Sequence, residues 1–100
     1  AHIMKKLTPL QEETMEYCKR QIDEARKQHI DLKKVKKRDY QAAVSTIEAQ
    51  NGMVYTQGGD CTIRTLRSLE KMGLIEVIED NSGIGTGVGA FPSKIKVLNY

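Results

Sequence analysis

The hydrophobic positions of the chain recur at two different spacings, which divide the sequence into helices and strands. Spacings of three and four residues place side chains on one face of a helix, whereas alternation places them on one face of a strand. The helical spacing occurs in three stretches, at about residues 8–28, 38–50 and 60–72. Alternating or β-prone stretches occupy residues 53–56, 74–79 and 93–98. This order of elements predicts an α+β fold with three helices and a small antiparallel sheet.

Capping signals mark the ends of two of these helices. Thr8 is followed by Pro at the first helical position and by Gln three residues after the cap, which predicts a helix start. Either Asp60 or Thr62 can cap the third helix, because a short side-chain oxygen accepts a hydrogen bond from a free N–H there. Gly73 ends that helix, because glycine enters the left-handed conformation without the steric cost of a Cβ.

The third helix combines a hydrophobic face with a basic one. Ile63, Leu66 and Leu69 share one stripe, which we expect to face the core. The opposite face carries groups suited to phosphates and base edges: Arg64, Arg67, Ser68 and Lys71.

The stretch RTLRSLEKMGLIEVIE, within residues 62–79, resembles the recognition helix and first wing strand of winged helix-turn-helix domains. Those domains often read R-T-[LV]-x-x-L-E-[KR]-x-G-L-I, and the resemblance covers about a fifth of this chain. It implies that the third helix enters the major groove while the second helix crosses the DNA backbone. Domains of this family serve in DNA binding and in protein contact, so the resemblance implies both uses as expectations for this chain.

Residues 81–92, NSGIGTGVGAFP, contain glycine at every second position from Gly83 to Gly89. A dinucleotide-binding signature has a similar spacing but needs a strand before it and a helix after it. Strands are predicted on both sides here, so a nucleotide cofactor is not expected. We interpret the segment as a glycine-rich wing between the last two strands.

The length and cysteine content indicate one small protein without cofactors. Residues 1–3 look like a cloning remnant before Met4, and residues 4–100 are expected to form a single winged-helix domain. No apolar run approaches the roughly 20 residues of a membrane-spanning helix, and no secretory signal is recognisable. Cys18 and Cys61 have no metal-binding spacing, so reduced thiols and a cytoplasmic location are expected.

The net charge of +3 is small, but its distribution is uneven. Residues 26–38 hold seven basic side chains and one acidic one, Asp31. Clustered positive charge is typical of a protein that binds phosphates. The basic entry to the second helix, which would lie near a phosphate strand, consists of Lys36, Lys37 and Arg38.

No catalytic motif is present, so the chain is not predicted to be an enzyme. Glu76, Glu79 and Asp80 cluster at the base of the wing, but they lack the spacing of a metal site. Their negative charge repels phosphate, which indicates that the wing contacts DNA at its tip or not at all.

These features predict sequence-specific binding of double-stranded DNA. Arg64 and Arg67 are candidates for guanine O6/N7 or for phosphate, and Ser68 for either. Thr62, near the free N–H groups of the helix start, suits a phosphate oxygen. Lys71 and Lys94 are further candidates for the backbone.

One module of this size reads few base pairs, which suggests a homodimer on a two-fold site, with the first helix as a candidate contact. Small free-standing winged helices are, by analogy, typical of bacterial, archaeal or phage transcriptional regulators. The alternative is a winged-helix module that binds another protein and no DNA, because the fold does not determine the function. The acidic wing base and the ten-residue connection before the third helix favour that alternative.

Overall fold

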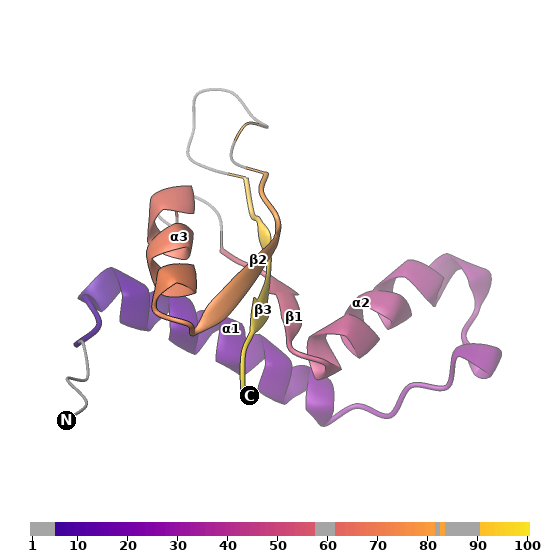
Figure 1. Ribbon diagram of the computed structural model, residues 1–100. Helices are drawn as coiled ribbons and strands as arrows, with labels where there is room; N and C mark the ends of the chain where they lie inside the picture. Colours follow the sequence, from indigo (N-terminus) through magenta and orange to yellow (C-terminus); the bar gives the residue numbers. More distant parts are fainter. Residues whose placement is uncertain (1–5, 58–61, 82, 84–90) are drawn as a thin grey trace.

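A computed structural model of the chain describes residues 6–57, 62–81, 83 and 91–100. Within these residues the elements follow the order predicted from the hydrophobic pattern, with two short 3₁₀ helices before the second α-helix (Figure 1). The α+β class, with three α-helices and a small antiparallel sheet, is therefore confirmed. The elements are α1 (Pro9–Arg26), η1 (Leu32–Lys34), η2 (Lys37–Asp39), α2 (Tyr40–Gln50), β1 (Met53–Tyr55), α3 (Ile63–Lys71), β2 (Ile75–Glu79) and β3 (Lys94–Val97).

The predicted start of α1 is confirmed as a capping box. The Gln11 backbone N–H donates to Thr8 Oγ1 at 3.2 Å, and the Thr8 N–H donates to Gln11 Oε1 at 2.9 Å. These two bonds satisfy donors that the first turn of a helix otherwise leaves free. The helix ends at Arg26 with Lys27 as its C-cap, two residues before the expected Gln28.

The three strands form one antiparallel sheet in the order β1-β3-β2. The strands β2 and β3 pair as the predicted hairpin, with Ile75 opposite Val97 and Val77 opposite Ile95. Asn81 closes the base of the hairpin, because its N–H donates to Ser93 Oγ and its side chain donates to the Pro92 carbonyl. The glycine-rich segment between them lies mostly outside the described residues.

The core lies between α1, α3 and one face of the sheet. Ile22, Leu69 and Ile95 are fully buried, each with no exposed surface. The predicted alternation in β3 is confirmed, since Ile95 and Val97 are buried while Lys96 is exposed. Tyr17 is partly buried and packs against the edge of this core. The remaining buried members of the core are Met15, Cys18, Val54, Leu66 and Ile75.

The second and third helices lie at different ends of α1. The α3 helix packs on β2 and on the N-terminal part of α1, whereas α2 packs on β1 and on the C-terminal part of α1 (Figure 1). The helix-turn-helix pairing expected from the resemblance is therefore not the arrangement of the described helices. In the chain β1 follows α2 directly and pairs with β3, so that a strand of the sheet separates α2 from α3.

Replacement of Leu69 by Ala tests the core. The side chain is completely buried, so the change leaves a cavity and should destabilise the fold by about 2–5 kcal/mol. Ile78→Ala is the matched control: Ile78 is 42% exposed, and its loss should cost less than about 1 kcal/mol. Urea unfolding followed by circular dichroism measures both changes, and equal losses would contradict the described packing.

Candidate functional site

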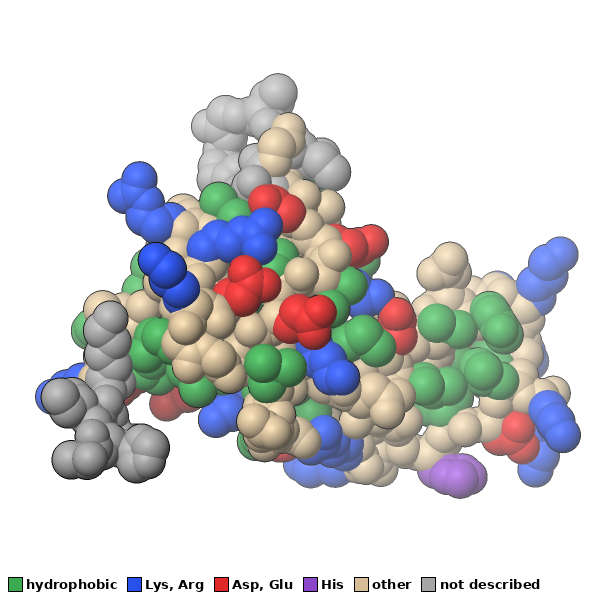
Figure 2. All heavy atoms as spheres, viewed as in Figure 1, with side chains coloured by type: hydrophobic (Ala, Val, Ile, Leu, Met, Phe, Trp, Pro, Cys, Tyr) green, Lys and Arg blue, Asp and Glu red, His purple; other side chains and the backbone are tan. Residues whose placement is uncertain are grey.

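The α3 helix presents a ridge of basic side chains on the side opposite its buried leucines. Leu66 and Leu69 anchor the helix in the core, and three residues at helical spacing, Arg64, Arg67 and Lys71, are exposed as predicted. We call these three residues the α3 ridge. On the face shown in Figure 2, Lys and Arg side chains gather over α3.

The ends of α3 follow the predicted capping residues with one difference. Thr62 is the N-cap residue, and its carbonyl accepts the Leu66 N–H at 3.2 Å, but its side chain makes no capping hydrogen bond. The exposed Thr62 hydroxyl therefore stays available for a contact at the helix start. Asp60, the other predicted cap, lies outside the described residues. Gly73 has a φ of +78°, which confirms the left-handed stop after the helix.

Arg67 is held by carboxylates on two sides. Its Nη1 donates to Glu70 Oε1 at 2.9 Å, and its Nη2 donates to Asp80 Oδ2 at 3.4 Å. The second oxygen of Glu70 accepts the backbone N–H of Val77 in β2 at 2.9 Å. These bonds join α3 to β2 and to the residue that follows it, so they fix the direction in which the guanidinium points.

The protonation of Glu70 and Arg67 reflects this network. The Val77 N–H, and after it the Arg67 guanidinium, lower the pKa of the Glu70 carboxyl. The hydrogen bond from Arg67 to Glu70 raises the pKa of the guanidinium, with Asp80 adding to the effect. Both side chains are therefore charged around neutral pH, and the bonds between them are charge-assisted.

Ser68 lies on the flank of α3 that faces α1. It is half-buried, its hydroxyl donates to the Thr65 carbonyl at 2.6 Å, and its oxygen accepts from Gln11 Nε2 at 2.9 Å. The structure thus places this predicted site residue in a link between α3 and α1. Gln11 completes the link while it also closes the cap of α1.

Lys94 lies on the sheet and not beside the α3 ridge. Its ammonium donates to Glu48 Oε2 of α2 at 2.6 Å, and the side chain is only 14% exposed. The Glu48 carboxylate raises the pKa of Lys94, and the Tyr55 ring lies 5.7 Å away. Lys94 therefore ties α2 to the sheet.

The basic run divides into two groups. Arg26 is structural, because it donates to the backbone carbonyls of Gln50 at 3.1 Å and Tyr100 at 2.8 Å. Lys27 pairs with Glu24 within the last turn of α1. We call residues 29–39, which contain η1 and η2, the arm. The exposed basic residues of the arm are Lys33, Lys34, Lys36, Lys37 and Arg38.

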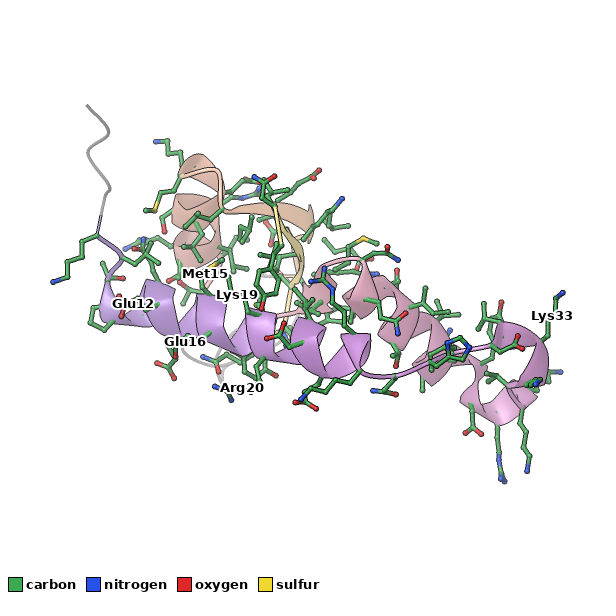
Figure 3. The ribbon with its side chains drawn as sticks, turned by 90° about the horizontal axis from the view of Figure 1, so that it is seen from below. Glu12, Met15, Glu16, Lys19, Arg20 and Lys33 are labelled. Carbon is green, nitrogen blue, oxygen red and sulfur yellow. The ribbon has the colours of Figure 1, made fainter. Side chains whose placement is uncertain are left out.

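The arm lies at the end of the molecule away from α3 (Figure 1). Seen from below, Lys33 points away from the body at the far tip of the arm (Figure 3). The structure consequently brings Arg64, Arg67 and Lys71 together but separates them from Lys36, Lys37 and Arg38.

An open hollow of about 490 Å³ lies on α3 beside the ridge. Its described lining consists of Arg67, Ser68, Glu70 and Lys71. All four residues carry a charged or hydroxyl group, but apolar atoms make up most of the exposed lining, so the hollow by itself does not indicate a kind of ligand.

Two other kinds of site are not found in the described part of the chain. No group of three or more His, Cys, Asp or Glu side chains there is placed to hold a metal ion. Among the described helices, none is long and apolar enough to cross a membrane.

Comparison of the chain with protein-family models, with curated proteins and with solved structures finds no match.

Sequence reasoning missed the acidic residues that position Arg67. The spacing of Arg67 and Glu70, three residues apart on one helix, is a signal for an ion pair and was available in the sequence. The role of Asp80 could not be recognised in the sequence, because its contact with Arg67 depends on the turn at Gly73 and on the length of β2. Gln11 lies 57 residues before Ser68, and no local pattern links the two.

Replacement of Glu70 by Gln should change how stability depends on pH. The pKa of Glu70 is lowered in the folded protein, so its contribution is full above the ordinary pKa of a glutamate and is lost as the pH falls through the lowered value. The wild type should exceed Glu70→Gln in stability near neutral pH, and the difference should shrink as the pH falls through the lowered pKa of Glu70. Urea unfolding at a series of pH values measures it.

Glu24→Gln is the control for this series. Glu24 forms an ion pair with Lys27 at the same spacing, but both side chains are well exposed. Exposed pairs of this kind contribute little, so this variant should follow the wild type at every pH. A Glu70→Gln curve that is parallel to the wild-type curve would rule out the proposed role of the carboxylate.

Proposed function

We propose that the chain is a winged-helix protein that binds double-stranded DNA in a sequence-specific manner, with α3 as the recognition helix in the major groove. A regulator of transcription is the role that we infer from such binding. The observation that carries the proposal is the α3 ridge, in which Arg64, Arg67 and Lys71 are exposed on a helix whose other face is anchored in the core.

The order of elements from α3 onward supports the winged-helix interpretation. The α3 helix is followed by a tight glycine turn and by the β2–β3 hairpin, which is the order of a recognition helix and its wing. An α-helix also fits the width of the major groove, and its exposed side chains then reach the base edges.

The surroundings of each basic residue suggest different roles. The carboxylates of Glu70 and Asp80 flank Arg67, and they would repel a phosphate but not the neutral O6 and N7 of a guanine. Arg64 and Lys71 have no carboxylate partner in the described residues, so they suit phosphates of either strand. Thr62 and the free N–H groups of the first turn suit a third phosphate.

Two residues that the sequence predicted as DNA contacts, Ser68 and Lys94, have side chains that are engaged within the protein. The hydroxyl of Ser68 is engaged with Gln11 and Thr65, and the ammonium of Lys94 is engaged with Glu48. We therefore leave both out of the proposed contact surface. The arm, with Lys36, Lys37 and Arg38, would reach DNA only at a place distant from the α3 ridge.

A second candidate function is binding of another protein through the same face of α3. The acidic side chains favour it, because Glu70 and Asp80 lie within the surface that would approach DNA. In that case Arg67 would serve as a positioned anchor for an acidic side chain of the partner.

Binding to a mixed-sequence DNA duplex over a series of salt concentrations tests the proposal. We expect an affinity that falls steeply with salt, since each phosphate contact adds about 0.9 to the slope of log K against log salt. Arg64→Ala should weaken binding and lower the slope by about one contact. Arg67→Ala should instead reduce the preference among sequences selected from a random pool, at a cost of about 1–3 kcal/mol.

Arg20→Ala is the matched control, because Arg20 is also an exposed arginine and points away from the body on α1 (Figure 3). It should leave the affinity and the salt slope unchanged. A folded protein that binds no duplex at low salt would exclude the DNA proposal and favour the protein-binding alternative. Equal losses in Arg20→Ala and Arg64→Ala would exclude α3 as the contact.

A further inference from the structure

The α2 helix carries a hydrophobic stripe that the rest of the described chain leaves partly uncovered. Tyr40, Val44 and Ile47 fall within an arc of about 60° at 100° per residue. Tyr40 is 49% exposed, and the other two are half-buried. Of the eleven residues of α2, Ala43 alone is buried. Figure 2 shows hydrophobic side chains gathered over α2 on the visible face, with nothing lying over them.

This stripe points away from α1. Ser45, Thr46 and Ala49 of α2 line an open hollow of about 350 Å³ shared with α1, so they mark the side of α2 that faces it. On a helical wheel these three positions lie opposite Tyr40, Val44 and Ile47. The stripe is therefore not the side of α2 that faces α1, and it borders Ala43, the buried residue of the helix, on the side of Ile47.

The N-terminal end of α2 has an unfavourable charge arrangement in the isolated chain. A helix start carries a partial positive charge, and cations placed there are destabilising. Lys36, Lys37 and Arg38 precede α2, which has no acidic residue in its first turn, and its N-cap residue Asp39 makes no side-chain capping bond. Asp39 contacts Arg38 at 3.9 Å between two exposed side chains, and Lys36 and Lys37 pair with no carboxylate in the described residues.

The C-terminal end of α2 has the opposite character. A helix end carries a partial negative charge, and Glu48 lies in the last turn with no basic residue beside it in the helix. Glu48 is bonded to Lys94, and it remains one-third exposed. The negative C-terminal end of one α2 helix would therefore attract the cations at the N-terminal end of another.

We propose that a second copy of this chain covers the stripe, with the two α2 helices packed antiparallel about a two-fold axis near Val44. A two-fold axis makes the same patch meet itself, which buries both stripes at once. The antiparallel direction places Lys36, Lys37 and Arg38 of each copy beside the negative end of the other copy's α2. DNA would neutralise these cations too, but it would leave the hydrophobic stripe exposed to water. A second copy satisfies both features.

This interface differs from the α1 contact that was expected for a homodimer. The outward face of α1 carries exposed charged side chains, and Figure 3 shows Glu16 and Arg20 pointing away from the body. An interface core is depleted of charged residues, so α2 is the better candidate. The proposal does not depend on DNA binding, because α3 lies at the other end of α1.

Sedimentation equilibrium over a wide range of protein concentration tests the proposal on the full chain. The wild type should reach the mass of a dimer, and Val44→Glu should remain a monomer because it would bury a charge at the two-fold axis. Gln41→Glu is the control, since Gln41 is an exposed residue of the same helix away from the stripe, and it should dimerise like the wild type. Circular dichroism must show equal helix content in all three proteins.

Cysteine variants test whether Val44 lies at the two-fold axis. Two residues that face each other at a two-fold axis lie close enough for a disulfide, so Val44→Cys should form a covalent dimer under mild oxidation, and Gln41→Cys should not. The double variant Lys36→Glu/Lys37→Glu should weaken the dimer, and added salt should weaken the wild-type dimer as well.

Several outcomes would overturn the proposal. They are a wild-type monomer at every concentration, a dimer that persists in Val44→Glu, and equal cross-linking of Val44→Cys and Gln41→Cys. Each of these leaves the DNA-binding measurements unaffected, because those variants do not touch α3. Loss of DNA binding in Arg64→Ala with an intact dimer would show that the two surfaces act separately.

Discussion

The burial of one face of α1 is the interaction on which the other elements depend. Cys18 and Ile22 on that face are almost completely inaccessible, and α2, α3 and β1 all pack against the helix. A nine-residue helix such as α3 is too short to be stable by itself in water, and a three-residue strand such as β1 is shorter still. Both owe their place to α1. The α3 ridge can act as a surface only because Leu66 and Leu69 are fixed in the core that α1 completes.

Features with a local cause could be predicted from the sequence. The Thr8 cap, the stop at Gly73 and the alternation of β3 follow from side chains within one turn or one strand, and all three are confirmed. The relation of α2 to α3 could not be predicted in this way, because it depends on how β1 pairs with a strand about forty residues later in the chain. The resemblance to winged-helix domains covers residues 62–79, and it carries no information about the packing of residues 29–57.

The candidate site also contains some features that could be predicted from the sequence and others that could not. The exposure of Arg64, Arg67 and Lys71 follows from the helical spacing, and the structure agrees with it. The bonds from Arg67 to Asp80 and from Ser68 to Gln11 span 13 and 57 residues, so they arise from tertiary packing alone. A count of the charges in residues 26–38 likewise places the structural Arg26 in one group with the exposed cations of the arm. Positive charge in a sequence locates cations but does not distinguish those that hold the fold together.

The bond between Glu70 and the Val77 N–H also has a consequence for the sheet edge. The β2 strand is an outer strand, and an N–H on its free side can pair with a strand of another molecule and begin aggregation. The Glu70 carboxylate occupies this N–H, and the negative charges of Glu76 and Glu79 along the same strand repel a second copy that approaches in the same way. The residue that positions Arg67 therefore also removes one free donor from the edge of the sheet, which makes unwanted strand pairing less favourable.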